Sequence, residues 1–311
     1  METCMSTKEQ VSIFNDAALD EEFRTKGYVV RPLISREEAA SLIDFHQARV
    51  PEHAPKDSFG WQSPDQYFTV FWKEDLRREF HDGISAVLRP HLEKIVPSHR
   101  VCLSSFVSKR PKGTQARVPL HQDLAFVDPG RQIAVHAWVP MVDVDEKSGC
   151  LKIIPGSHRL KHIGSTPMNP SPWDNLRDVM ESEFMTPIPM AAGSVLIYDG
   201  RLLHASDQNM SDDWRIATNS IMIPRGVAPR IYYWSPPTTY SILEVTDEYF
   251  IGFDYLTPMP QPFPSGVKKV GSVEYEIKQL RLEDIEHLRP PRANRRSWFG
   301  NLLGRLAGKL G

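Results

Sequence analysis

The sequence has 311 residues, a formal net charge of −2, 41% hydrophobic residues and 24% charged residues. This is enough apolar material for one large domain or two ordinary ones, and the near-zero charge gives no reason to expect nucleic acid as a partner. Three cysteines without repeated spacing favour a reducing compartment, so we expect a cytoplasmic protein. The N-terminal METCMSTKEQ lacks the apolar stretch of a secretory signal, and no run of 18 apolar residues predicts a membrane span.

The first hundred residues predict a mixture of short strands and helices. Ser35 is a good N-cap, and Glu38 three residues later completes a capping box at the start of a helix. A second helix has apolar residues at helical spacing and a predicted kink near Pro90. The predicted elements in this region are a strand at 28–34, a helix at 36–49, a strand at 67–72 and a helix at 76–96.

From residue 101 the chain consists of short β-type runs separated by Gly, Pro, Asn and Asp. This pattern is typical of an antiparallel sandwich or barrel. The stretch 165–176 is predicted to be a surface loop, either a lid or binding element or a tolerated excursion. We expect a single domain over 1–311: helical support at about 1–100, a β core at about 101–235, an extension at about 236–289 and a tail at 290–311.

The stretch HQDLAFVDPG (121–130) places a histidine and an aspartate two residues apart. Residues i and i+2 of a strand point to the same face, so His121 and Asp123 would aim at one point. That point could be a metal, a substrate proton or water, and the triplet alone does not decide between them.

A second histidine, His204, precedes turn residues at 209–213. We interpret the region as a hairpin in which Ser206 lies opposite Arg215 and His204 opposite Ala217. Strand alternation places His204 and Ser206 on one face in any register, whereas the position of Arg215 depends on the turn.

Together these residues suggest a metal site with an anion anchor. Two histidines and one carboxylate form the facial triad of non-haem Fe(II) oxygenases, which leaves three coordination positions open for a bidentate 2-oxo acid and O₂. An arginine at the edge would hold the far carboxylate of that acid. Zinc hydrolysis is the competing use of such a ligand set, and any one of these histidines alone is more typical of a hydrogen-bonded core or loop residue.

The motifs HQD, HAWVPMVDVDEKSGCLKIIPGSH and GSVLIYDGRLLHASDQNMSDDWRIA resemble the phytanoyl-CoA dioxygenase family of Fe(II)/2-oxoglutarate oxygenases. The resemblance covers about 100–235 and extends more loosely to FRTKGYVVRPLISREEAASLIDF. It implies a mainly β fold, a double-stranded β-helix (jelly roll, cupin-like) with N-terminal helices packed on the sheet.

The resemblance also assigns roles to particular residues. It implies that His121, Asp123 and His204 bind Fe(II), and that Arg215, eleven residues after the distal histidine, binds 2-oxoglutarate. Ser206 and Trp138 would border the same keto acid. Since Asp123 is present, the halogenase variation of this site is not expected.

Three neighbouring residues have two interpretations each. His136 shares a strand face with Trp138, so it either contacts substrate in the cavity or is a buried, hydrogen-bonded histidine. Asp199 and Arg201 flank the turn before His204, and we expect them to pair with each other rather than to reach into the site.

The expected function is a 2-oxoglutarate-dependent dioxygenase with Fe(II), 2-oxoglutarate and O₂ as cofactors and co-substrates. It would hydroxylate an unactivated C–H bond of a small molecule and release succinate and CO₂, although desaturation or ring formation is open. The alternatives are a metal-dependent hydrolase or isomerase on a cupin-like barrel, and a jelly-roll binding protein without catalysis.

Aromatic, mildly charged stretches at 67–72, 165–176 and 231–240 are the candidate pocket walls. They suit a free, partly apolar small molecule, such as a lipid, an amino-acid derivative or a natural-product intermediate. The tail 290–311 is basic and amphipathic with glycines every four residues. We expect one of three outcomes for this tail. It docks on its own subunit or on a partner subunit, it contacts a membrane surface or a protein partner, or it is disordered. The chain would be a monomer or a dimer.

Overall fold

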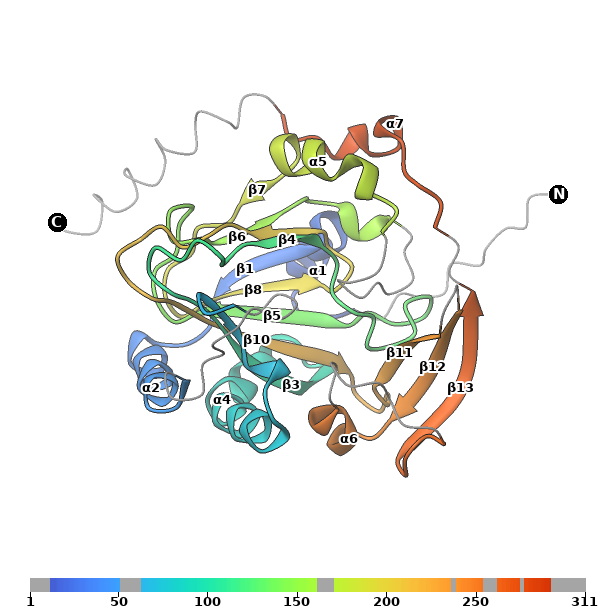
Figure 1. Cartoon of the computed structure of the whole chain (residues 1–311), viewed down its shortest axis with the longest axis horizontal. Coiled ribbons are helices and arrows are strands. Elements are labelled where there is room, and N and C mark those ends of the chain that lie inside the picture. The colour runs from blue at the N-terminus through green and yellow to red at the C-terminus, as the bar shows by residue number, and fades with distance from the viewer. Residues whose placement is uncertain are drawn as a thin grey trace.

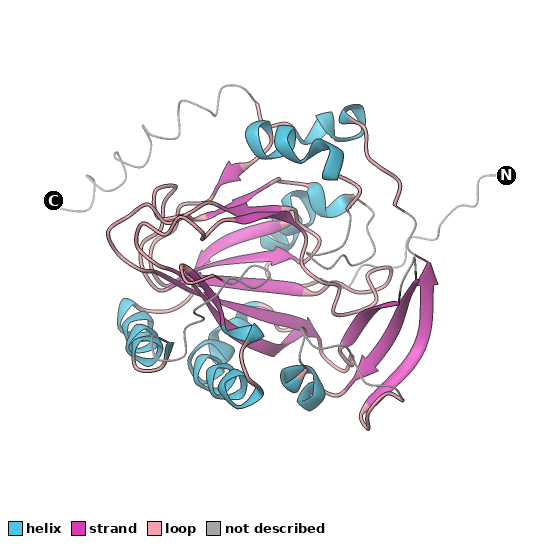
Figure 2. Cartoon of the chain, in the orientation of Figure 1, coloured by secondary structure: helices cyan, strands magenta, loops and turns pink. Residues whose placement is uncertain are grey.

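In the computed structural model of the chain, two antiparallel sheets face each other between layers of helices (Figures 1 and 2). The structure describes residues 12–50, 63–160, 171–235, 239–253, 262–274 and 277–291. The larger sheet has the strand order β1 (Tyr28–Pro32), β8 (Ser194–Asp199), β5 (Val135–Pro140), β10 (Arg215–Pro224), β3 (His99–Lys109) and β2 (Gln66–Phe68).

The smaller sheet has the order β4 (Val118–His121), β9 (His204–Ser206), β6 (Leu151–Ile153) and β7 (Thr186–Pro187). From β3 to β10 the chain passes back and forth between the two sheets, which is the winding of a jelly roll. The predicted fold class is therefore confirmed. A third sheet extends the fold at one end with β11 (Arg230–Ser235), β12 (Thr239–Val245) and β13 (Val267–Glu274).

Helices cover the outer faces of both sheets (Figure 1). Below the larger sheet lie α2, α4 and α6, and above the smaller sheet lie α5 and α7. None of the described helices has both the length and the apolar character needed to cross a bilayer. The helices are α1 (Ala17–Lys26), α2 (Arg36–Gln47), α4 (Glu74–Ile95), α5 (Arg177–Glu183), α6 (Asp247–Gly252) and α7 (Leu282–Ile285).

The two predicted N-terminal helices are confirmed. The Ser35 side chain accepts from the Glu38 backbone N–H while the Glu38 carboxylate accepts from the Ser35 N–H, as a capping box requires. The second helix, α4, runs without a break from Glu74 to Ile95 and contains Pro90. Its apolar stripe of Phe80, Ile84 and Leu88 is fully buried against the larger sheet, where each such side chain contributes about 1.5–3 kcal/mol.

One sequence prediction needs correction here, and one helix was not predicted. The stretch 67–72 is a strand only as far as Phe68, after which Thr69–Phe71 forms a 3₁₀ turn. The predicted loop at 165–176 continues into a helix, α5, that the sequence did not indicate. Residues 161–170 lie outside the described residues, as do residues 292–311 of the tail.

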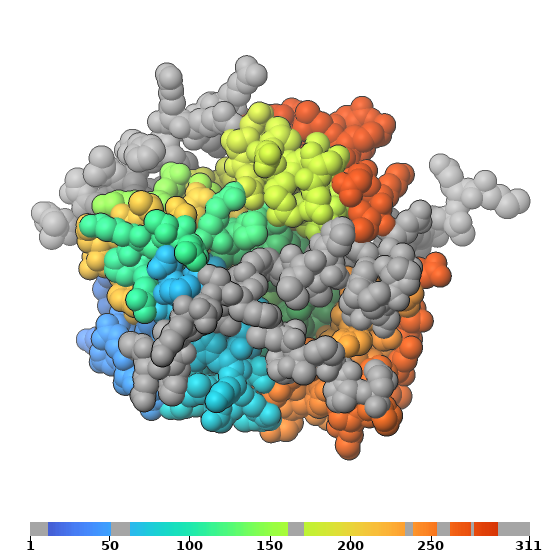
Figure 3. Space-filling view, viewed as in Figure 1, coloured from blue at the N-terminus to red at the C-terminus, as the bar shows by residue number. Residues whose placement is uncertain are grey.

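The helix α5 packs with the C-terminal elements over the smaller sheet. Figure 3 shows the two segments side by side on the surface. Arg289 pairs with Glu183 and lies over the Phe184 ring, and Ile285 and Leu288 join the same apolar cluster. This cluster also contains Leu120, so it supports the strand that ends at His121.

Candidate metal centre and anion pocket

Three side chains from the smaller sheet and the loop beside it come together between the sheets. His121 ends β4 and His204 begins β9, and the two residues are direct partners in the register of these strands. Asp123 follows two residues after His121. One ligand atom from each side chain lies within 4.8 Å of the other two, which is the spacing of a three-ligand metal site.

Backbone carbonyls fix the orientation of both imidazoles. The Nδ1 atom of His121 lies 2.8 Å from the Pro119 carbonyl oxygen, and that of His204 lies 2.9 Å from the Leu202 carbonyl oxygen. Because a carbonyl only accepts, each Nδ1 carries the proton and each Nε2 presents its lone pair to the centre. The two Nε2 atoms lie 3.8 and 3.7 Å from the Asp123 carboxylate oxygens.

The charge states of these groups suit a divalent metal. Burial, together with the neighbouring His204, lowers the pKa of His121 to about 3, so the ring is neutral. Burial would raise the pKa of Asp123, but the imidazoles of His136, His204 and His121 and the Tyr198 hydroxyl outweigh it and bring the pKa to about 2. Two imidazoles and one carboxylate are the donor set of a facial triad, so these residues fit Fe(II).

Two buried cations lie next to this centre. Arg215 in β10 and Lys109 in β3 are direct register partners and are 1% and 0% exposed. The Lys109 ammonium donates to the Ser206 hydroxyl at 2.7 Å and to the backbone carbonyls of Ser206 and Asp207. Since Ser206 is two residues after His204 in β9, the lysine links the cation pair to a candidate metal ligand.

Neither cation has a carboxylate partner within the described ranges. Arg215 donates through Nη1 to the Val107 carbonyl at 2.8 Å, but its Nε has no partner there. The Trp138 Nε1 is likewise buried without a partner, and the guanidinium lies 5.7 Å from the Trp138 ring centre. Unpaired buried charge is costly, so the donor set of this pocket fits a small dicarboxylate such as 2-oxoglutarate.

Burial lowers the pKa of both cations. It lowers the pKa of Arg215 to about 9 and lowers the pKa of Lys109 well below its usual value, with the Arg215 charge adding to the effect on lysine. A bound dianion would stabilise both charged forms, because an opposite charge in a buried site favours ionisation.

The predicted hairpin between His204 and Arg215 is wrong. Ser206 pairs with Val118 and Leu151 in the smaller sheet, whereas Arg215 pairs with Lys109 in the larger sheet. The chain crosses from one sheet to the other between them. Ser206 and Arg215 nevertheless approach the same place, because Lys109 lies between them. The sequence interpretation missed Lys109, although its alternation with Leu103, Ser105 and Val107 assigns it to the inner face.

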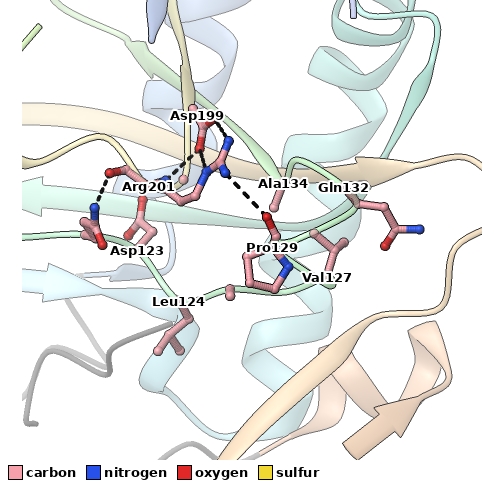
Figure 4. A pocket seen from close by; sticks show the side chains of 11 residues that line it. Asp123, Leu124, Val127, Pro129, Gln132, Ala134, Asp199 and Arg201 are labelled. Carbon is pink, nitrogen blue, oxygen red and sulfur yellow. Dashed lines mark hydrogen bonds and ion pairs between the residues drawn. The ribbon is translucent and has the colours of Figure 1, made fainter. Parts of the chain in front are cut away.

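His136 lies behind Asp123 and is 1% exposed. Its Nδ1 is hydrogen-bonded to the Asn219 amide at 3.2 Å and lies 3.1 Å from the Asp123 Oδ2, which matches the buried, hydrogen-bonded alternative that the sequence left open. Asp199 and Arg201 pair with each other through two hydrogen bonds, as expected. Both border a pocket that opens beside Asp123 (Figure 4).

That pocket has a mostly apolar wall. Figure 4 shows Asp123 at one side, the Asp199–Arg201 pair above and Pro129 and Val127 along the loop. Two of the stretches predicted to form the pocket wall can be compared with this pocket. Tyr232, from 231–240, donates to the Val127 carbonyl at 3.0 Å and so supports the loop. Tyr67, from 67–72, is fully buried and does not line the pocket. Residues 165–170 and 236–238 lie outside the described part of the chain.

The family model and the similar curated proteins point to the same family. The family model for phytanoyl-CoA dioxygenase (PhyH) matches residues 23–217. The chain is 29% identical over 148 residues to "Phytanoyl-CoA dioxygenase domain-containing protein 1" of Bos taurus, covering 44% of this chain and 50% of that protein. It is 33% identical over 125 residues to "Phytanoyl-CoA dioxygenase" of Arabidopsis thaliana, covering 38% and 42%. The chain thus spans about half the length of the curated relatives that it matches.

Among solved structures, one similar fold is that of "the epimerase SnoN in complex with Fe3+, alpha ketoglutarate and nogalamycin RO". The TM-score is 0.51 at 23% identity, covering 81% of this chain and 94% of that one. At this identity the likeness shows the shared fold.

Proposed function

The chain belongs to the phytanoyl-CoA dioxygenase family, and from this premise we propose that it is an Fe(II)/2-oxoglutarate-dependent dioxygenase acting on a small molecule. One observation carries the proposal. A cluster of two histidines and an aspartate lies beside a buried lysine–arginine pair that has no carboxylate partner in the described ranges. A metal hydrolase uses the first feature but has no need of the second.

His121, Asp123 and His204 would hold the iron, with the two Nε2 lone pairs already oriented by backbone carbonyls. The chemistry supplied by Fe(II) with 2-oxoglutarate and O₂ is oxidation of a substrate C–H bond, coupled to loss of CO₂ and formation of succinate. Three protein ligands leave the remaining positions for the keto acid and O₂.

Arg215 and Lys109 would neutralise the far carboxylate of 2-oxoglutarate. Ser206 accepts from Lys109 and so retains its own O–H to donate to the same carboxylate. The Trp138 Nε1–H supplies one more donor on the inner face of the larger sheet. The buried walls exclude water from these charges, which strengthens each interaction.

The substrate would enter beside Asp123. This pocket is lined by apolar side chains and by two amides, and the cation among its described residues, Arg201, is already paired with Asp199. The apolar residues are Leu124, Ala125, Val127, Pro129 and Ala134, and the amides are Gln122 and Gln132. This lining favours a free, partly apolar and largely uncharged molecule, such as a lipid, an amino-acid derivative or a natural-product intermediate. Hydroxylation is the expected outcome.

The compartment and assembly are part of the same proposal. Cys102 and Cys150 are free, buried thiols, and burial raises the pKa of each to about 12. Such thiols support a cytoplasmic location. We expect a monomer or a dimer, with the 290–311 tail docking on a surface of this chain or of a partner.

The test is conversion of 2-oxoglutarate in the presence of a metabolite extract. The purified chain with Fe(II) should form succinate only when O₂ is admitted, and one metabolite should gain the mass of one oxygen atom. Asp123→Ala should form no succinate and retain no iron, because a three-ligand site that loses its carboxylate loses both charge and a ligand. Product formation without O₂ would instead favour a hydrolase or isomerase.

A further inference from the structure

The Asp123 carboxylate is held from behind by two residues of the larger sheet. The Tyr198 hydroxyl donates to its Oδ2 at 2.8 Å, and the His136 Nδ1 lies 3.1 Å from the same oxygen. One oxygen of the candidate metal ligand is thus contacted by both residues, and the same Oδ2 lies 3.7 Å from the His204 Nε2, whereas Oδ1 lies 3.8 Å from the His121 Nε2. The sequence analysis assigned no role to Tyr198.

The fold fixes these two partners with respect to each other. His136 in β5 and Tyr198 in β8 are direct partners in the antiparallel register, and their rings stack with centres 5.3 Å apart. They are 1% and 3% exposed. Gly200 also passes close to this ring, since a Cβ added there would lie 3.3 Å from the His136 Nε2. The pair has little freedom to follow a moving carboxylate.

The protons of both contacts are determined by their chemistry. A carboxylate only accepts, so the Tyr198 hydroxyl donates and the His136 proton lies on Nδ1. The Asn219 amide, whose Nδ2 lies 3.2 Å from the same Nδ1 and whose Oδ1 has no partner, must then turn its oxygen toward that proton. Burial lowers the pKa of His136 and raises that of Tyr198 well above its usual value, so both groups are neutral donors near neutral pH. The Gly200 carbonyl accepts from the Asp123 backbone N–H at 3.0 Å and fixes the main chain there as well.

We propose that His136 and Tyr198 are positioning residues that hold Oδ2 of Asp123 and so present Oδ1 alone to the metal. This inference rests on the proposed function. A carboxylate that is free to turn can bind a metal through both oxygens. The second oxygen would then occupy a position that a bidentate keto acid or O₂ needs. The pair thereby keeps the open side of the triad open.

The test measures metal binding separately from turnover. Co(II) dissociation constants would be determined for the wild type, His136→Leu, His136→Asn and Tyr198→Phe. His136→Leu should weaken binding by about 10- to 100-fold, the usual effect of losing a hydrogen bond to a ligand. His136→Asn should recover most of the loss, because its amide nitrogen occupies the place of Nδ1. Tyr198→Phe should weaken binding by less than about tenfold.

A second readout reports on the open positions. The visible charge-transfer band of the anaerobic Fe(II)–2-oxoglutarate complex should be weakened or shifted in His136→Leu at saturating metal, because the keto acid then competes with the second carboxylate oxygen. The matched control is His46→Leu. His46 is an equally buried histidine with one hydrogen bond, to Ser108 at 2.8 Å, and its loss should change the Co(II) constant by less than about twofold.

Each outcome distinguishes the two proposals. A wild type that binds no divalent metal overturns the proposed function, and this inference with it. A wild type that binds metal while His136→Leu and Tyr198→Phe bind it equally well overturns only this inference. Equal losses in His136→Leu and His136→Asn would assign the effect to ring packing and also contradict it. Should His136→Leu fail to fold, Tyr198→Phe decides, since it removes a single hydroxyl.

Discussion

Lys109 and Arg215 lie directly opposite each other in adjacent strands of the larger sheet, and both are fully buried. Like charges in opposed positions of a sheet are destabilising, and burial increases the cost. Hydrogen bonds from Lys109 to Ser206 and Asp207 and from Arg215 to Val107 satisfy part of their donors. A bound dianion would balance the charge of the pair, which makes the pair itself the best evidence for a keto-acid site.

The first prediction concerns Lys109. Lys109→Met should weaken 2-oxoglutarate binding by about 10- to 100-fold, since a hydrogen bond to a charged group contributes about 1.5–3 kcal/mol. The same variant should be no less stable than the wild type without 2-oxoglutarate, because it removes a buried charge that repels Arg215. Isothermal titration and denaturant unfolding would measure the two effects.

Lys152→Met is the matched control. Lys152 lies in the smaller sheet, and its charge is already paired with Asp207. Its 2-oxoglutarate constant should stay within about twofold of the wild type. Unchanged binding in Lys109→Met would show that the lysine does not face the keto acid.

The second prediction concerns Arg215. Arg215→Ala should raise the 2-oxoglutarate requirement by about 30-fold or more, because truncating one partner of a buried charge pair costs about 2 kcal/mol or more. The Fe(II) affinity measured without keto acid should change little, since Arg215 contacts none of the three ligands. Trp138→Phe removes the Nε1–H but keeps an aromatic ring, and it should have a smaller effect. Steady-state titration of 2-oxoglutarate at saturating Fe(II) measures the effect of each variant. If Arg215→Ala lost as much Fe(II) affinity as 2-oxoglutarate affinity, the assignment of Arg215 to the keto acid would be contradicted.

The sequence was most informative where local rules apply. Strand alternation placed His204 and Ser206 together, and the capping box at Ser35 predicted the start of α2. It was least informative about which strand lies beside which. The hairpin interpretation failed because the turn residues at 209–213 lead the chain into the other sheet.

The missed residues depend on tertiary contacts. Lys109 meets Arg215 only through the pairing of β3 with β10, more than a hundred positions apart in the chain. The helix α5 has seven residues without a clear apolar period and is held by burial of Met180 against its neighbours. Neither the contact between Lys109 and Arg215 nor the helix α5 can be predicted from the residues around it in the sequence.

The third prediction concerns the support of His121 by α5. Glu181 accepts the Leu120 backbone N–H at 2.9 Å, and Arg177 donates to the Leu120 carbonyl. Glu181→Ala leaves that N–H without its partner, so the free energy of unfolding should fall by about 1–3 kcal/mol. Metal affinity should fall by less than about tenfold, because the strand loosens but keeps its ligands.

Asp178→Ala on the same helix is the control, because this side chain is exposed. It should leave both the unfolding free energy and the metal affinity near the wild-type values. Equal effects in the two variants would mean that helix stability, rather than the bond to Leu120, is responsible.

The fourth prediction is a pH dependence of stability. Burial lowers the pKa of His46 to about 4, whereas an unfolded histidine titrates near 6.5. Between these values the unfolded chain binds a proton that the native His46 does not, so the free energy of unfolding falls as the pH falls. The slope from this residue is at most about 1.4 kcal/mol per pH unit.

Urea unfolding of the metal-free protein between about pH 7 and about pH 5 would measure this slope. His46→Gln keeps a donor near Ser108 but does not titrate. The slope of its unfolding free energy against pH should therefore be smaller, by up to the contribution of one proton. Identical slopes in the wild type and His46→Gln would show that His46 titrates normally in the folded protein.

The most direct test of the account is anaerobic titration of 2-oxoglutarate into the wild type with and without Fe(II). If His121, Asp123 and His204 share one pocket with Lys109 and Arg215, the keto acid bridges metal and cations, and Fe(II) should tighten its binding by about tenfold or more. Binding of 2-oxoglutarate with the same constant in both titrations would contradict the account, because the three-ligand cluster and the cation pair would then be independent sites.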